Sequence, residues 1–143
     1  MFQPRKTTSA QPRPGEATTR HVEGRIVDTT YHGYCSRALV QSVLDYTPDV
    51  LSKVPGTCWL LDMGEVTAFD SECRVPGSEI LNLFRDGGGD RFAVVVTSGM
   101  LRMTLAAVAF ASRLPIKLFA SRSEALAYLR SRGAPREEGQ SRA

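Results

Sequence analysis

Apolar positions along the chain follow two patterns, one typical of buried strands and the other typical of amphipathic helices. Residues 57–63 and 92–97 are nearly continuous apolar runs, which predict central strands that are covered on both faces. β-branched residues are frequent over 22–31, and a short apolar run follows at 116–119, so we expect a strand at each place. The pattern therefore predicts four strands.

Between and after these strands, apolar residues recur at the spacing of a helix. Ser36 and Ser98 stand where each can cap a helix N-terminus. Ser121 and Glu124 have the spacing of a capping box, which predicts another helix start. The predicted helices run from Ser36 to about Lys53, over 76–85, over 99–113, and from Ser121 past Leu129.

Strands and helices thus alternate along the chain, and this order predicts an α/β fold. We expect a small, mostly parallel sheet of four to five strands with helices packed on it. The first strand, 22–31, either is a single extended strand or pairs as a hairpin, and the pattern leaves both arrangements open.

The basic charge of the chain is concentrated at its two ends. Residues 1–20 hold four basic residues and one acidic residue, whereas 21–130 holds 11 basic and 12 acidic residues. The segments 1–20 and 133–143 have few large apolar groups, so we expect disordered tails around one domain at 21–132. Because no basic patch runs through that domain, we do not expect a nucleic-acid partner.

Several other classes of protein are also disfavoured. No apolar run reaches the roughly 18 residues that a membrane span needs, and residues 1–20 do not resemble a secretory signal, so we expect a cytoplasmic protein. Cys35, Cys58 and Cys73 have no zinc-ligand spacing, so we expect three free thiols, two of them buried. Nothing in the chain predicts a metal or a cofactor.

Residues 60–71, LLDMGEVTAFDS, form the most informative motif. A predicted buried strand reaches Leu61 and Asp62, a short loop follows, and Asp70 and Ser71 open a helix. This segment resembles the signature of STAS domains, the fold of bacterial anti-sigma-factor antagonists. The closing run from Leu114 into the last helix is similar to the SpoIIAA-like branch of that fold, which is related in shape to CRAL-TRIO lipid-binding domains.

In anti-sigma-factor antagonists, the serine at this place is phosphorylated by a partner kinase that also acts as the anti-sigma factor. The resemblance implies that Ser71 is a phosphorylation candidate, and that Asp62, Asp70, Ser71 and Glu72 contact a protein partner. The family usually continues with Ser or Thr and then Gly, where this chain has Glu72 and Cys73. The alternative is that Asp70 or Ser71 is only a helix cap.

Other polar positions have structural interpretations beside the functional ones. Thr97, Ser98 and Gly99 stand at a predicted strand-to-helix junction, where they could bind an anion or a ligand or simply cap the helix. Asp62 is better explained by hydrogen bonds to loop amides than by catalysis. The three glycines at 87–89 precede a strand rather than follow one, so they do not form a phosphate-binding loop.

We therefore interpret the protein as a non-catalytic signalling module that binds another protein. The main alternative is a domain that binds a small molecule or lipid. Met100, Met103 and Phe110 could line an apolar ligand cavity, although the core is the commoner place for such residues. No acid–base pair is recognisable, which is the argument against an enzyme. An exposed sheet edge or the region of Trp59 could support a homodimer.

Overall fold

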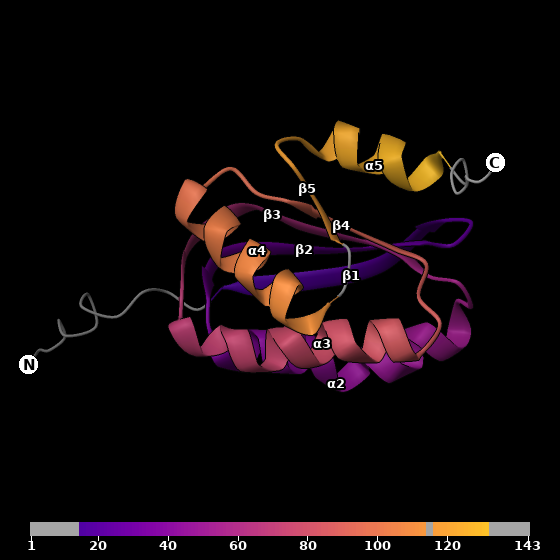
Figure 1. The fold of residues 1–143 in the computed structure, drawn as a ribbon, viewed down its shortest axis with the longest axis horizontal. Helices are drawn as coiled ribbons and strands as arrows, with labels where there is room; N and C mark the ends of the chain where they lie inside the picture. Colours follow the sequence, from indigo (N-terminus) through magenta and orange to yellow (C-terminus); the bar gives the residue numbers. More distant parts are fainter. Residues whose placement is uncertain (1–14, 114–115, 132–143) are drawn as a thin grey trace, which may run out of the picture.

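The computed structural model of the protein describes residues 15–113 and 116–131. Five strands form one sheet, with helices on both of its faces (Figure 1). The strands are β1 (Glu16–Glu23), β2 (Ile26–Cys35), β3 (Cys58–Phe69), β4 (Arg91–Val95) and β5 (Ile116–Phe119). The helices are α2 (Arg37–Lys53), the single 3-10 turn η2 (Ser71–Cys73), α3 (Arg74–Asp86), α4 (Gly99–Ser112) and α5 (Arg122–Arg130).

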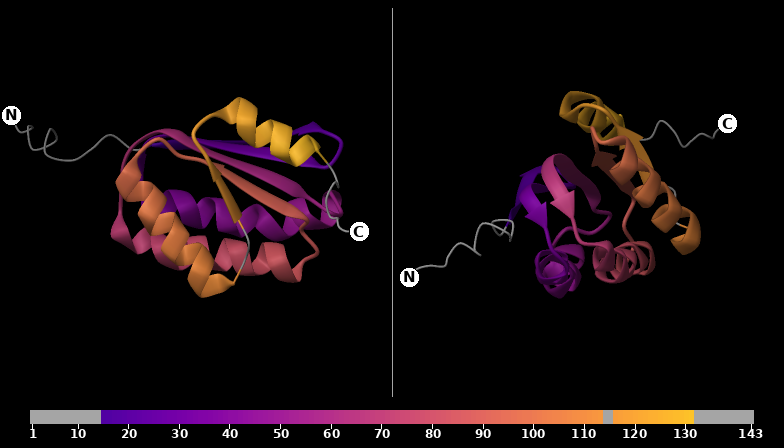
Figure 2. Two further views of the ribbon diagram at one scale, coloured as in Figure 1. Left: turned by 45° about the horizontal axis from the view of Figure 1, so that its top comes forward. Right: turned by 90° about the vertical axis from the view of Figure 1, so that its left-hand side faces the viewer.

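The strands lie in the sheet in the same order as along the chain, from β1 to β5. β1 and β2 are antiparallel, and every other neighbouring pair is parallel. Helices α2 and α3 cover one face, and α5 lies on the other side of the sheet (Figures 1 and 2). The predicted fold, a mostly parallel sheet of four to five strands in an α/β protein, is confirmed.

The N-terminal segment settles the choice that the sequence left open, because it forms a hairpin. Gly24, at a φ of 51°, makes the turn between β1 and β2. The predicted boundary between tail and domain, after residue 20, is wrong, since residues 16–20 belong to β1. β1 is a largely exposed edge strand with few large apolar groups, so its composition resembles that of a tail. The remainder of the predicted tails, 1–14 and 133–143, lies outside the described residues.

β3 is longer than the apolar run predicted. It continues beyond Met63 to Phe69, over the segment expected to be a loop, because its second half pairs with β2 as far as Cys35. No residue of β3 after Met63 is fully buried, which is why the hydrophobic pattern ends there. The motif 60–71 therefore lies mostly in a strand.

Each face of the sheet packs against its own apolar core. On the α2 and α3 side, Trp59, Phe84 and Phe92 form an aromatic cluster with ring centroids 5.0–6.4 Å apart. The indole N–H of Trp59 donates to Thr29 Oγ1 at 2.9 Å. Trp59 is only 1% exposed, so its side chain cannot contact a second copy, and a homodimer through an exposed sheet edge stays a prediction. The core on the α5 side consists of Ile26, Cys58, Leu60, Ala93, Val95, Ala125 and Leu129.

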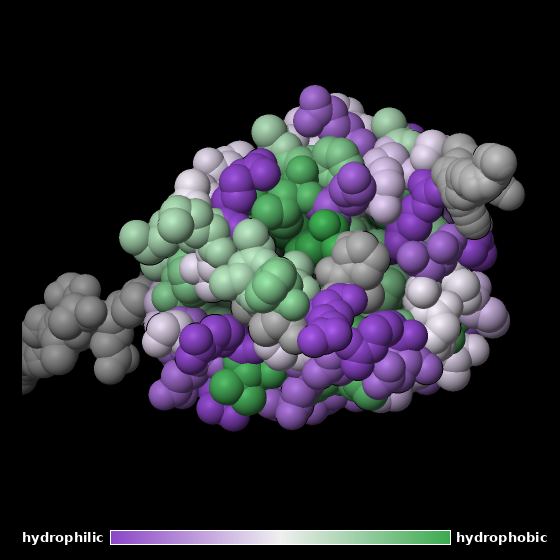
Figure 3. All heavy atoms as spheres, in the orientation of Figure 1, coloured by the Kyte–Doolittle hydropathy of each residue, from purple (hydrophilic) through white to green (hydrophobic). Residues whose placement is uncertain are grey.

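Helix α4 has apolar residues on its outer surface as well as its inner one. Met100, Met103 and Phe110 are 72%, 74% and 88% exposed, so the expectation that they belong to the core is wrong. Figure 3 shows apolar side chains gathered on this face of the molecule. The inner side carries Leu101 and Leu105. The side chain of Val108 lies outside the described part of the structure.

Candidate functional site

The loop after β3 is held in place by backbone hydrogen bonds to the end of β2. The N–H of Asp70 donates to the carbonyl of Cys35 at 2.9 Å, and the N–H of Cys73 donates to the carbonyl of Asp70 at 2.9 Å. Asp70 is the N-cap of η2, and its Oδ1 accepts from the N–H of Glu72 at 3.0 Å. The predicted capping role of Asp70 is therefore confirmed, and the loop has a defined shape.

Ser71 lies at the first position of η2, with an exposed side chain. No hydrogen bond among the described residues uses its hydroxyl group, so Ser71 is not the cap. Glu72, beside it, is also exposed and forms an ion pair with Arg37 of α2 at 3.7 Å. Asp70, Ser71 and Glu72 thus form one continuous polar surface, which we call the η2 surface.

Two cysteines lie directly beneath the η2 surface. Cys35 is buried and Cys73 is half-buried, and the Cys73 thiol donates to the carbonyl of Cys35 at 3.2 Å. Interaction with the Cys35 thiol lowers the pKa of Cys73, with help from the backbone of Asp70, whereas interaction with the Cys73 thiol and burial raise the pKa of Cys35. All three cysteines are free, and Cys35 and Cys58 are buried, as predicted.

Asp62 does not belong to the η2 surface. It is eight residues before Asp70 in an extended strand, which corresponds to roughly 25 Å along β3. Its Oδ1 accepts from the N–H of Gly64 at 3.0 Å, and its Oδ2 pairs with Arg122 of α5 at 3.1 Å. Asp62 therefore contacts the helix on the other side of the sheet. The structure thus supports the hydrogen-bonding interpretation and separates Asp62 from the proposed partner-binding residues.

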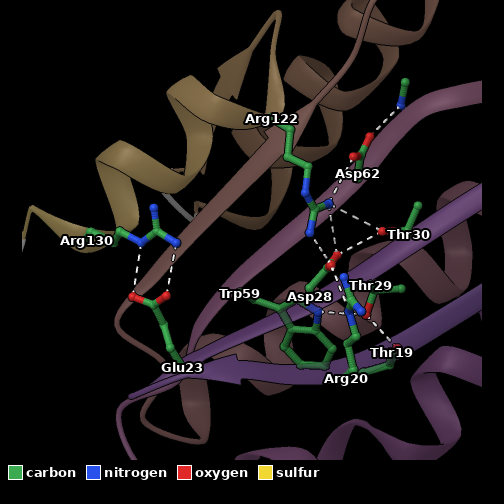
Figure 4. Close-up of polar contacts among 11 residues, drawn as sticks. Thr19, Arg20, Glu23, Asp28, Thr29, Thr30, Trp59, Asp62, Arg122 and Arg130 are labelled. Carbon is green, nitrogen blue, oxygen red and sulfur yellow. Dashed lines mark hydrogen bonds and ion pairs between the residues drawn. The ribbon is translucent and has the colours of Figure 1, made fainter.

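Arg122 joins Asp62 to a second carboxylate that the sequence analysis missed (Figure 4). Asp28 of β2 is 2% exposed and accepts hydrogen bonds from Arg122 and from Thr30 Oγ1. Arg20 of β1 approaches the same carboxylate at 3.7 Å. A charged residue within a predicted strand rich in β-branched residues was the available signal, because a buried carboxylate needs a partner. These ion pairs connect α5 to the sheet. The carboxylates of Asp28 and Asp62 already bind Arg122 and neighbouring groups.

Thr97, Ser98 and Gly99 form the exposed junction between β4 and α4. Ser98 is the N-cap of α4, and its Oγ accepts from the N–H of Leu101 at 3.3 Å. The start of α4 and the start of α3 lie at the same end of the sheet (Figure 1). The helix-capping interpretation is confirmed for Ser98, and binding of an anion or ligand by the three residues stays a prediction.

No protein-family model and no curated protein matches this sequence. Solved structures do match. The anti-sigma factor antagonist SpoIIAA, in its unphosphorylated form, gives a TM-score of 0.63 at 14% identity, over 82% of this chain and 98% of that one. The chain has the SpoIIAA-like, or STAS, fold.

Two further structures support the same assignment. An anti-sigma factor antagonist from Mycobacterium paratuberculosis matches with a TM-score of 0.62 at 13% identity, over 82% of this chain and 95% of that one. A putative anti-sigma factor antagonist from Thermotoga maritima matches with a TM-score of 0.61 at 19% identity, over 80% and 94%. The resemblance inferred from residues 60–71 is therefore confirmed as a likeness of fold.

The SpoIIAA-like fold of this chain contains one further feature, an apolar cavity of about 90 Å³ beside the η2 surface. Strands β2 to β5, the turn η2 and helices α2, α3 and α4 all contribute residues to its lining. Met100, Met103 and Phe110, which could have lined such a cavity, do not contribute to it. It was not predictable from the sequence, since the lining residues come from eight separate elements.

Across 15–113 and 116–131, no group of three or more His, Cys, Asp or Glu side chains is placed to hold a metal ion. Among the helices of the same ranges, none has both the length and the apolar character needed to cross a membrane.

Proposed function

We propose that the protein is a non-catalytic, cytoplasmic signalling module that binds a protein partner through the η2 surface, and that phosphorylation of Ser71 controls this binding. The observation that carries the proposal is the exposed hydroxyl of Ser71, which no described residue engages, on a loop that hydrogen bonds hold in a defined shape. Anti-sigma factor antagonists share the fold, which supports a protein partner rather than a nucleic acid.

A phosphate on Ser71 would change the charge of the η2 surface without unfolding the loop. It would add about −1.5 to −2 charges next to Glu72 and Asp70. The hydrogen bonds that hold the loop involve Asp70 and backbone groups, not the Ser71 hydroxyl, so they would remain. A partner docked on this surface would therefore meet repulsion and a higher cost of desolvation.

The first test is phosphosite mapping by mass spectrometry on the protein isolated from its own cells. We expect phosphate on Ser71 under at least one growth condition. The second test compares partner recovery by the wild type, Ser71→Asp and Ser123→Asp. Ser123 is exposed on α5, away from the η2 surface, so it controls for added charge alone. The proposal is supported if less partner is recovered with Ser71→Asp but not with Ser123→Asp. Equal recovery with all three proteins contradicts it.

A second candidate function is the binding of a small molecule or lipid, and the apolar cavity favours it. Ser71 and Cys73 contribute to the cavity lining, so a ligand there would lie next to the η2 surface. This function predicts that an apolar compound co-purifies with the protein. Native mass spectrometry at gentle energies would detect it, and bare protein alone would count against it.

A further inference from the structure

The cavity is shaped for a small apolar body. The sheet contributes Trp59, Phe92 and Ile116, α3 contributes Ile80, and α4 contributes Leu101. Its volume of about 90 Å³ is too small for a peptide helix or a whole lipid. Comparable apolar cavities in proteins stay dry and take up small ring compounds, because no polar group holds water there.

Gly77 of α3 keeps part of this space open. A Cβ added at Gly77 would meet no heavy atom within 4 Å, although the residue lines the cavity. Glycine is a poor helix former, and Gly77 lies within α3 rather than at its end. A larger side chain would suit the helix better and would add bulk at a position that lines the cavity, so the glycine is consistent with an open cavity.

The few polar groups of the cavity include one cation without a charged partner. Arg74, the first residue of α3, lines the cavity and is exposed to solvent. It forms no ion pair among the described residues, in contrast to Arg37 and Arg122. Thr104, another polar lining residue, already donates to the carbonyl of Met100 at 3.1 Å. Arg74 is thus available to bind an anionic group at the edge of the cavity.

We propose that the cavity binds a small carboxylic acid with an apolar body of about six carbon atoms. The body lies between the sheet and helices α3 and α4, and the carboxylate binds to the guanidinium of Arg74, which suits carboxylate geometry. This assignment rests on the second candidate function and names its ligand class and the residue that recognises it. It does not require a phosphate on Ser71.

Trp59 provides a direct measurement, since it is the only tryptophan of the chain and it lines the cavity. We would titrate the full chain with octanoate and follow the tryptophan fluorescence, using octan-1-ol as the uncharged comparison. Octanoate can place its last six carbons in the cavity and still reach Arg74. We expect a saturable change with both compounds and tighter binding of octanoate.

Three variants test the two parts of the site. Gly77→Leu fills the cavity and should abolish the response to both compounds, whereas the smaller Gly77→Ala should weaken it only partly. Arg74→Gln leaves the cavity intact, and it should weaken octanoate binding about tenfold while octan-1-ol is unaffected. Circular dichroism of each variant checks that it folds, and Arg74→Gln tests the proposal even if Gly77→Leu does not.

The outcomes distinguish a failure of the proposed ligand class from a failure of the second candidate function. Equal octanoate binding by the wild type and Arg74→Gln overturns the assignment of Arg74 and of a carboxylate. No saturable response to either compound overturns the proposed ligand class. If native mass spectrometry nevertheless finds another apolar compound bound, the second candidate function is still supported. If native mass spectrometry also finds no bound compound, the ligand class and the second candidate function are both wrong.

Discussion

Asp28 of β2 and Arg122 of α5 form an ion pair across 94 residues of sequence, and it links the sheet to the helix that covers its second face. The Asp28 side chain is 2% exposed, whereas the Arg122 side chain is 34% exposed. The arginine therefore shields a buried carboxylate while one side of its own guanidinium remains near water. Asp62, which binds the same guanidinium, strengthens the link.

Replacing Arg122 with Met should destabilise the protein substantially. The substitution leaves the buried Asp28 carboxylate without its main partner, and we expect the free energy of unfolding to fall by about 2–3 kcal/mol. Urea denaturation followed by circular dichroism measures this. Asp28→Asn in the same background should recover part of the loss, because it removes the unpaired charge. If Arg122→Met unfolds at the wild-type urea concentration, the pair does not stabilise the fold.

Cys73 should be the most reactive of the three thiols. Its pKa is lowered by interaction with the Cys35 thiol, so a larger fraction is thiolate near neutral pH than for an ordinary cysteine. Cys35 and Cys58 are buried, and their pKa values are raised. At pH 7 we expect iodoacetamide to modify Cys73 at least about tenfold faster than the other two, as measured by peptide mass spectrometry.

The control for this prediction is Cys35→Ala, which removes the neighbouring thiol. The pKa of Cys73 should then rise, and the pH at which its alkylation rate is half-maximal should rise with it. An unchanged pH profile would show that Cys35 does not set the reactivity of Cys73.

Gly89 should tolerate no side chain. A Cβ at this position would lie 2.4 Å from the ring of Phe84, which is 1% exposed and packs edge-on against Phe92 at 5.0 Å. We expect Gly89→Ala to lower the free energy of unfolding by about 1–3 kcal/mol, because the ring has little room to move. Urea denaturation again provides the measurement.

Gly77→Ala is the matched comparison, since its Cβ meets nothing within 4 Å. It should be neutral or stabilising by up to about 1 kcal/mol, because alanine is the better helix former. Similar losses for both glycine variants would mean that contact with Phe84 is not the cause.

Local features of the fold were predictable from the sequence. The N-caps Ser36, Ser98 and Ser121 all accept a hydrogen bond from the backbone N–H three residues later. Such caps depend on a few neighbouring residues, and the apolar runs of β3 and β4 depend only on burial on both faces. The alternation of these elements was enough to predict the fold class, and the motif at residues 60–71 carried the resemblance.

Relationships between distant segments were not predictable in the same way. The second half of β3 is a strand because β2 lies beside it as far as Cys35, and its own residues gave no such signal. Asp62 was grouped with Asp70 because both belong to the motif at residues 60–71, but an extended strand separates them and Arg122 forms an ion pair with Asp62. Met100, Met103 and Phe110 were assigned to the core because they are apolar, but α4 carries apolar residues on its outer side as well, and these three are exposed.

The sheet order has a consequence for how the chain folds. Because β1 to β5 are neighbours in space in the same order as in sequence, each new strand pairs with the strand formed just before it. Each pair of consecutive parallel strands is joined through one α-helix, so no strand pairs with a segment that is distant in sequence. Such a topology has a moderate contact order, which is associated with faster folding than that of an all-β sandwich of similar size. As the chain emerges during synthesis, the sheet can grow strand by strand from the hairpin, and the ion pair of Arg122 with Asp28 closes the assembly at the end.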